Sequence, residues 1–283
     1  MQTYSMTACA KINLSLYVLG KRPDGYHDIE SVMQTVDFGD TVTLSALETP
    51  EIQLTTNISD LPVDEGNIAW RAAKLMQETF ALSCGFSIHI EKRIPIAAGL
   101  AGGSTNAAAV MHLINKACNL EKTVEELAAI GVKLGADVPF CLYGKSALAE
   151  GIGERLTPVV GLKNCYIVLA NPGVQVSTGM IYKALDGETN PKIGDSNALL
   201  AALKENNLPK AFLHMSNMME KVASAYCPAI SELLVKLKKA GADHVMMSGS
   251  GATCFGIFLK EPSEQDVKTY LGKDFVAIAK PSV

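Results

Sequence analysis

The chain has 283 residues, of which 48% are hydrophobic and 19% charged, with a net charge of −4 and an isoelectric point near 5.8. These values suit a soluble globular protein of one large or two ordinary domains. They argue against nucleic acid or an anionic membrane as the main partner. No apolar run reaches the length of a membrane span, and Lys11 and Asn13 interrupt the place where a signal peptide needs its apolar centre. We therefore expect a cytoplasmic protein.

The seven cysteines are scattered and include no CxxC pair, which predicts free thiols in a reducing compartment. We expect them to act as small buried hydrophobes. The five histidines show no HxxxH spacing and have no cysteine at ligand distance, so the sequence offers no protein cage for a metal ion.

The first predicted strand covers residues 7–20, where apolar and polar side chains alternate. Lys11 and Asn13 fall on its polar face. A solvated edge is the usual explanation for such a face, and a face that points into a site is the alternative. The pattern taken alone favours solvent.

A Pro-Asp-Gly turn at 23–25 places Tyr26 and His27 directly behind it. Both side chains are positioned for recognition, although a lone histidine is more often a packing residue and a tyrosine can simply cover a strand. Residues 28–40 return as an extended run, which predicts a hairpin with the first strand. Further strands are predicted at 41–47 and 52–56.

A helix is predicted from Asn67, which is a good N-cap, to about Phe80. The following segment, 87–92, alternates and predicts a strand. Lys92 at its end could lie beside a ligand or on a solvated face of the strand.

A loop of small residues at 95–105 links this strand to a helix with apolar positions at helical spacing. Such a loop lets backbone N–H groups converge, and the positive end of the helix dipole adds to the attraction for phosphate. The loop is not a Walker A motif, because no lysine follows the glycines at the required place, and it does not fit GxGxxG. A tight packing turn between strand and helix is the alternative.

Thr123 and Glu126 form a capping-box pattern, which predicts a helix that ends near Gly135. Asp137 follows at a predicted helix-to-strand turn, between small and apolar residues. A capping or turn aspartate is the ordinary interpretation. The functional alternative is a carboxylate that projects into a cavity from a rigid junction.

A domain boundary is predicted near 158–164, which gives an N-terminal domain over 1–160 and a C-terminal domain over 161–283. The second domain is expected to contain strands at 165–170, 245–248 and 254–259 and helices at 178–183, 197–205, 210–225 and 229–240. A second glycine-rich turn occupies 248–251.

Three separated segments together resemble the GHMP kinase superfamily of small-molecule kinases. They are Ala10-Lys11-Ile12-Asn13-Leu14, the loop at 95–105 with its Pro-x-x-x-Gly-Leu-x-Gly-Gly-Ser pattern, and Ser248-Gly249-Ser250-Gly251. They follow the family's order and span almost the whole chain. The resemblance implies a two-domain α+β fold: an N-terminal domain like domain 2 of ribosomal protein S5, a C-terminal ferredoxin-like α/β sandwich, and an active site in the cleft between them.

The resemblance also implies ATP and Mg²⁺ as cofactors. The implied ATP-binding residues are Asn67, Pro95, Ile96, Ala97, Ala98, Gly99, Leu100, Ala101, Gly102, Gly103, Ser104 and Thr105. Asn67 would contact adenine, although a helix cap alone also explains it. Mg²⁺ would bridge the phosphates near the Ser104 hydroxyl, without a protein cage. The turn at 248–251 is expected to support the loop or to contact a substrate diphosphate, with a plain tight turn as the alternative.

Lys11 and Asp137 are the catalytic pair that the resemblance implies. Asp137 would accept the proton of the substrate hydroxyl, and Lys11 would keep Asp137 ionised and neutralise phosphoryl charge. The implied acceptor is a cytidine diphosphate-linked polyol of isoprenoid precursor synthesis, with two tyrosines on either side of the cytosine. The implied substrate-binding residues are Asn13, Tyr26, His27, Thr178 and Tyr182. We expect a monomer or weak homodimer that acts on a small molecule.

The chain departs from the family's usual residues at Cys9, Ala101 and Thr105, which replace proline, glycine and serine. Alanine at 101 permits close backbone approach but not a positive φ at low cost. Two alternatives stay open. One is a family member that acts on mevalonate, phosphomevalonate, homoserine or a sugar; the other is a catalytically silent nucleotide-binding regulator. The retention of Lys11 and Asp137 argues against the silent protein.

Overall fold

The computed structural model describes residues 2–187, 196–272 and 274–282 and divides the chain into two compact units. Each unit combines three separate segments of the chain. Unit 1 consists of Met1–Ala10, Gly39–Ile94 and Ala101–Gly144, and unit 2 of Lys11–Phe38, Pro95–Leu100 and Lys145–Val283. The domain boundary at residue 160 stays a prediction.

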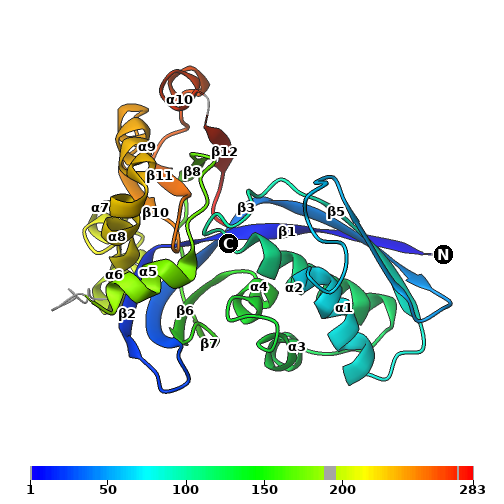
Figure 1. The fold of residues 1–283 in the computed structure, drawn as a ribbon. Helices are drawn as coiled ribbons and strands as arrows, with labels where there is room; N and C mark the ends of the chain where they lie inside the picture. Colours follow the sequence, from blue (N-terminus) through cyan, green and yellow to red (C-terminus); the bar gives the residue numbers. More distant parts are fainter. Residues whose placement is uncertain (1, 188–195, 273, 283) are drawn as a thin grey trace. The chain divides into compact units, whose positions relative to one another are not determined.

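Two long strands, β1 (Thr3–Asn13) and β3 (His27–Leu47), contribute residues to both units (Figure 1). Within unit 1, β3 pairs with β5 in antiparallel register, and β4 runs parallel to β5. The other elements of unit 1 are β4 (Ile52–Thr56), α1 (Ile68–Thr79), β5 (Gly85–Glu91), α2 (Gly102–Ala117), α3 (Val124–Gly131) and α4 (Val138–Tyr143).

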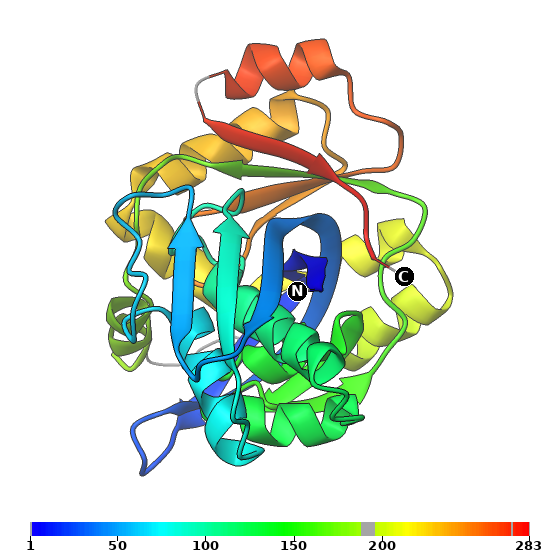
Figure 2. The same cartoon turned by 90° about the vertical axis from the view of Figure 1, so that its right-hand side faces the viewer.

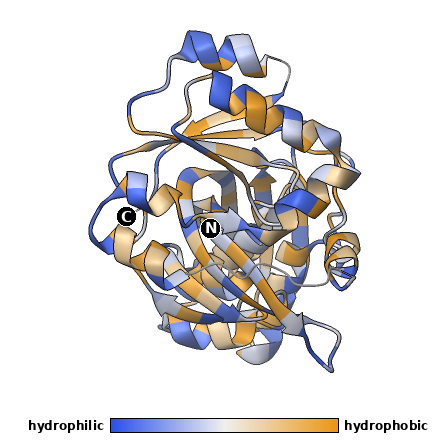
Figure 3. Cartoon of the chain, turned by 90° about the vertical axis from the view of Figure 1, so that its left-hand side faces the viewer, coloured by the Kyte–Doolittle hydropathy of each residue, from blue (hydrophilic) through white to orange (hydrophobic). Residues whose placement is uncertain are grey.

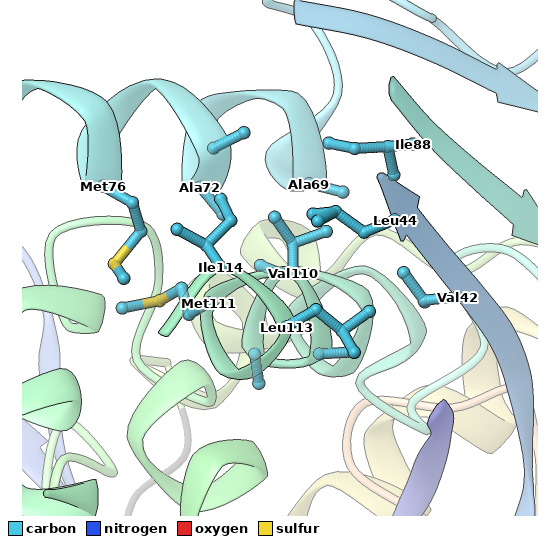
Figure 4. Packing of buried hydrophobic residues seen from close by; sticks show 14 of the residues in the cluster. Val42, Leu44, Ala69, Ala72, Met76, Ile88, Val110, Met111, Leu113 and Ile114 are labelled. Carbon is cyan, nitrogen blue, oxygen red and sulfur yellow. The ribbon is translucent and has the colours of Figure 1, made fainter. Parts of the chain in front are cut away.

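The core of unit 1 lies between its strands and the helices α1 and α2. Figure 4 shows Leu44 and Ile88 of the strands facing α1 and α2, with Met76 of α1 beside Met111 of α2. α1 packs along α2, and small alanines such as Ala72 let the two helix backbones approach closely. The predicted N-cap of α1 and the predicted capping box of α3 are both confirmed.

Unit 2 contains a four-stranded antiparallel sheet in the order β10-β11-β8-β12, which is drawn in orange, green and red in Figure 2. α9 lies against β8, β10 and β11, and α10 packs on α9. The strands of this sheet are mostly hydrophobic and α10 is mostly hydrophilic (Figure 3), as expected for a sheet whose central strands β8 and β11 are buried and for an outer helix.

The remaining strands of unit 2 surround the His27–Phe38 part of β3, which pairs in antiparallel register with β2 and β6. The elements of unit 2 are β2 (Ser15–Lys21), β6 (Ser146–Gly151), β7 (Arg155–Pro158), β8 (Tyr166–Asn171), α5 (Thr178–Leu185), α6 (Ser196–Lys204), α7 (Leu208–Phe212), β9 (Ser216–Asn217), α8 (Met218–Tyr226), α9 (Pro228–Lys239), β10 (His244–Met247), β11 (Cys254–Phe258), α10 (Glu264–Leu271) and β12 (Phe275–Ala279).

Several predicted elements have different boundaries in the structure. The predicted strands at 28–40 and 41–47 form the single strand β3. The predicted helix at 210–225 is wrong, because α7 ends at Phe212 and α8 begins only after the Asn217 cap. The cysteines are free, as predicted, but four of them are only partly buried. Among the helices of the described residues, none has both the length and the apolar character that a membrane crossing requires.

Candidate active site

Lys11, at the end of β1, is buried, with only 5% of its surface exposed. Its Nζ donates hydrogen bonds to Asn13 Oδ1 at 2.7 Å and to the Gly99 carbonyl at 3.0 Å. Asn13 is also buried and donates to Ser31 Oγ at 2.8 Å. The prediction that this polar face lies in solvent is therefore wrong, because its side chains bond to one another and to the loop inside unit 2.

The Pro95–Leu100 part of the predicted phosphate loop belongs to unit 2, where the second glycine-rich turn holds it. Ser248 Oγ donates to the Gly99 carbonyl at 2.9 Å, and the Thr253 N–H donates to the Ala98 carbonyl at 3.2 Å. Ala98 is buried, whereas the side chain of Ile96 is exposed. The expectation that the turn supports the loop is confirmed.

The remainder of the loop, from Ala101 onward, forms the N-terminus of α2 in unit 1. Ala101 is the N-cap residue and has a left-handed backbone with φ +57°, which the usual glycine would adopt more easily. Gly102, Gly103 and Ser104 form the first turn of the helix, with Ser104 close to Gly135. The 16-residue α2 directs the positive end of its dipole toward this turn.

Thr105 is buried, and its hydroxyl donates to the Cys9 carbonyl at 2.7 Å. Two of the three positions at which the chain departs from the family's usual residues are therefore in contact. The hydroxyl serves the structure of unit 1, and ATP binding by Thr105 stays a prediction.

A buried ion pair that no sequence pattern predicted lies at the end of β5. Asp40 is fully buried and pairs with Lys92, whose Nζ also donates to Asn106 Oδ1 at 2.8 Å. Asp40 Oδ1 accepts from the backbone N–H groups of Arg93 and Ile94 at 2.6 and 2.8 Å. The ion pair fixes the backbone just before the loop. A solvated position for Lys92 is thereby excluded.

Asp137 is the N-cap residue of α4 in unit 1, so it stands between two helices and not before a strand as predicted. Its carboxylate makes no capping hydrogen bond to α4, which removes the ordinary structural role. Asn67 does cap α1, because its Oδ1 accepts from the Ala69 N–H at 3.0 Å. The pairing of Asp137 with Lys11 and the adenine contact of Asn67 stay predictions.

Two of the predicted acceptor-binding residues lie side by side in unit 2. The rings of His27 and Tyr182 are stacked, with centroids 4.6 Å apart and planes inclined by 18°. His27 Nε2 lies 2.7 Å from Asp186 Oδ1, and Lys21 Nζ lies 2.8 Å from Asp186 Oδ2. The hydrogen bonds from Lys21 and His27 lower the pKa of the Asp186 carboxyl. Tyr26 is 59% exposed, so its ring is open to a ligand.

Thr178, the first residue of α5, contacts the second glycine-rich turn through its hydroxyl, 2.7 Å from Ser250 Oγ. The structure therefore groups the predicted residues into two sets within unit 2. Lys11, Asn13 and Gly99 form one set, and His27 and Tyr182 the other.

Comparison with known proteins identifies the family to which the chain belongs. The family model for the GHMP kinases N terminal domain matches residues 67–145, and the model for the GHMP kinases C terminal domain matches residues 199–277. The chain therefore belongs to the GHMP kinase family, and it is an enzyme of the kinase class.

Within this family, several similar curated proteins are named 4-diphosphocytidyl-2-C-methyl-D-erythritol kinase. The protein of Alkaliphilus metalliredigens is 45% identical over 91% of this chain and 89% of its own length. The protein of Bacillus subtilis is 40% identical over 92% of this chain and 90% of its own. A crystal structure of 4-(cytidine 5'-diphospho)-2C-methyl-D-erythritol kinase has a TM-score of 0.81 at 31% identity, covering 99% of this chain and 100% of that one. A homoserine kinase from Cytophaga hutchinsonii matches at 0.78 and 20% identity, over 100% of this chain and 95% of its own, and shows the fold alone.

Proposed function

We propose that the protein transfers the γ-phosphate of ATP to the 2-hydroxyl of 4-diphosphocytidyl-2-C-methyl-D-erythritol, in the non-mevalonate route to isoprenoid precursors. The names of relatives that are 40–45% identical support this substrate. We also propose that the protein is cytoplasmic and that it is a monomer or a weak homodimer.

The buried Lys11 ammonium is the observation that carries the proposal. Within the described residues, both of its hydrogen-bond partners, Asn13 Oδ1 and the Gly99 carbonyl, are uncharged. A buried cation without an anionic partner is unfavourable, and the arrival of an anion relieves that penalty. The phosphates of ATP are the anions that a glycine-rich loop next to Lys11 suits best.

In this proposal the backbone of the 95–105 loop and the dipole of α2 bind the ATP phosphates. Lys11 neutralises charge on the transferring group, and Asp137 accepts the proton of the 2-hydroxyl. Support for Asp137 comes from its lack of a capping hydrogen bond, because the carboxylate is then available for chemistry.

The donors near the loop suit a Mg²⁺ ion that arrives with ATP. Ser104 offers one hydroxyl on the first turn of α2. No group of three His, Cys, Asp or Glu that could hold a metal is found among the described residues. Mg²⁺ accepts such a site because it keeps several waters and phosphate oxygens as ligands. When bound, it would neutralise phosphate charge.

The proposed acceptor site consists of Tyr26, His27 and Tyr182, with Asn13 and Thr178 as hydrogen-bonding residues. The stack of His27 on Tyr182 supports it, because a planar face is already assembled there for a flat base such as cytosine. A small acceptor without a base has no use for these rings.

The test is phosphorylation by ATP of 4-diphosphocytidyl-2-C-methyl-D-erythritol, followed by phosphorus NMR, with mevalonate and homoserine in parallel reactions. A new phosphomonoester in the cytidyl reaction alone is the expected result. Turnover of mevalonate or homoserine instead would support the kinase activity but contradict the proposed cytosine site. ATP binding without turnover in any reaction would favour the silent regulator.

A further inference from the structure

Asn217 lies between α7 and α8, directly before α8. Both the amide nitrogen and the amide oxygen of its side chain form hydrogen bonds inside unit 2. Its Nδ2 donates to the carbonyls of Met247 and Gly249 at 2.9 and 2.8 Å. Its Oδ1 accepts from the Met219 N–H at 2.9 Å and so caps α8. The side chain is 7% exposed, so water competes little for these bonds.

Glu220, in the first turn of α8, also binds the backbone of Met247. Its Oε2 accepts from the Met247 N–H at 2.7 Å. Asn217 and Glu220 together therefore hold both the N–H and the carbonyl group of Met247, the last residue of β10. Two side chains at the N-terminus of α8 therefore fix the backbone of Met247, directly before the second glycine-rich turn.

That turn is in direct contact with the groups assigned to phosphate transfer. Ser248 Oγ donates to the Gly99 carbonyl, which also accepts from Lys11 Nζ. Gly249 packs so closely that a Cβ atom there would lie 3.0 Å from the Gly99 carbonyl oxygen and 3.4 Å from Lys11 Nζ. A shift of the turn would therefore move Gly99 and change the surroundings of the Lys11 ammonium.

We propose that Asn217 and Glu220 are positioning residues for phosphoryl transfer. They hold the second glycine-rich turn against Gly99 and Lys11. The inference rests on the proposed function, because it assigns the transfer step to Lys11. In the part of the chain that the structure describes, neither residue bonds to Gly99 or Lys11 itself. A displacement of about 1 Å in a reacting geometry can reduce a rate by about 100-fold, so loss of these supports is expected to lower kcat.

The discriminating variant is Asn217→Asp. Aspartate retains an acceptor for the Met219 N–H and remains a good N-cap, but it cannot donate to the two carbonyls. We expect kcat to fall roughly tenfold to 100-fold, with the KM of the acceptor unchanged within about twofold. The matched control is Asn207→Asp, because Asn207 caps α7 through Oδ1 alone, and its kcat should not change. Unchanged kcat in Asn217→Asp would overturn the proposal.

Glu220 supplies a second test that remains valid if Asn217→Asp does not fold. Glu220→Gln retains an acceptor for the Met247 N–H and should restore most of the kcat that Glu220→Leu loses. If the glutamine variant is as impaired as the leucine variant, acceptance from Met247 is not the role of Glu220.

A double-mutant cycle separates positioning from general loss of structure. If Asn217 acts through Lys11, then adding Asn217→Asp to Lys11→Ala should lower the residual kcat by less than about threefold. An undiminished further loss in the Lys11→Ala background would contradict that route.

A readout independent of turnover separates this inference from the proposed function. Amide hydrogen exchange at 247–251 should accelerate at least about tenfold in Asn217→Asp and stay unchanged in Asn207→Asp. If wild type phosphorylates no acceptor while the exchange result holds, the proposed function fails and the support of the turn stands. Unchanged exchange overturns the support itself.

Discussion

A Cβ atom added to Gly99 would lie 2.2 Å from the carbonyl oxygen of Ser248. This approach is closer than any real Cβ contact, so the loop and the second glycine-rich turn pack directly through their backbones. Gly99 also has φ +78°, a conformation that other residues adopt only with strain. Both properties require glycine at this position.

We therefore expect Gly99→Ala to lower the free energy of unfolding by more than the 1–2 kcal/mol of left-handed strain alone, about 3 kcal/mol in total. Gly173→Ala is the matched control, because Gly173 has φ +74° with open space around it. Urea denaturation of both variants measures the difference. Equal losses would mean that the contact with Ser248 is relaxed in solution.

Ala101→Gly is expected to stabilise the protein. Ala101 has φ +57° at the N-cap of α2, and glycine would remove left-handed strain of roughly 1 kcal/mol. Ala201→Gly, at an exposed position in α6, makes the same chemical change in ordinary helix and should instead destabilise by about 1 kcal/mol. Thermal unfolding should show shifts of opposite sign for the two variants.

Asp137→Asn is expected to lower kcat by about 10² to 10⁴, because asparagine cannot accept the proton of the acceptor hydroxyl. The carboxylate forms no cap for α4, so the melting temperature should stay near that of wild type. Steady-state kinetics with circular dichroism provides both values. Turnover close to wild type would show that Asp137 is not the base.

Tyr26→Ala is expected to raise the KM of the cytidyl acceptor roughly threefold to tenfold and to leave the KM of ATP unchanged. The estimate corresponds to the loss of one offset stacking contact, about 0.5–1.5 kcal/mol. Tyr270→Ala removes another exposed tyrosine, on α10, and should change neither constant. An equal rise of both KM values in Tyr26→Ala would count against the proposed cytosine site.

His244 predicts a specific pH dependence of stability. Burial, with a smaller contribution from the charge of Lys238, lowers the pKa of His244 from 6.5 to about 4, and the ring stacks on Phe212. As the pH falls below about 6.5, His244 therefore binds a proton in the unfolded chain but stays neutral in the folded protein until the pH nears 4. Stability present above pH 6.5 is lost as the pH falls toward 4, by up to about 3 kcal/mol.

Replacement by a non-titrating ring isolates this effect. His244→Phe retains an aromatic partner for Phe212 and should flatten the decline of unfolding free energy between pH 6.5 and 4. His89→Gln, at a half-exposed ring on β5, is the control for the removal of one histidine. Identical slopes for all three proteins would show that His244 titrates normally.

Elements with strong local signals were predictable from the sequence. The Asn67 cap, the capping box at Thr123 and the strand β4 each depend on residues within a few positions of one another. The break between α7 and α8 was missed, because apolar periodicity continues across it. The break between the two helices is held by Asn217, whose side chain bonds to Met247 and Gly249, some 30 residues away.

Burial of polar groups was the other feature that the sequence pattern could not reveal. Alternation assigns Lys11 to a polar face but does not say that this face is covered. Asp40 and Lys92 stand 52 positions apart, and neither carries a local signal for an ion pair. The order of strand, loop and helix around residues 95–105 was predictable, because the small residues of the loop and the following helix are contiguous in the chain.

The interleaved segments of the two units have a consequence for synthesis on the ribosome. All residues of unit 1 have been made by Gly144, whereas unit 2 receives its largest segment afterward. Gln34 of β3 accepts a hydrogen bond from Ser146, which is made 112 residues later. Because translation proceeds at about 5–20 residues per second, the delay is on the order of ten seconds. During that interval the His27–Phe38 part of β3 has no β6 beside it, so a nascent chain exposes a strand edge that the finished protein conceals.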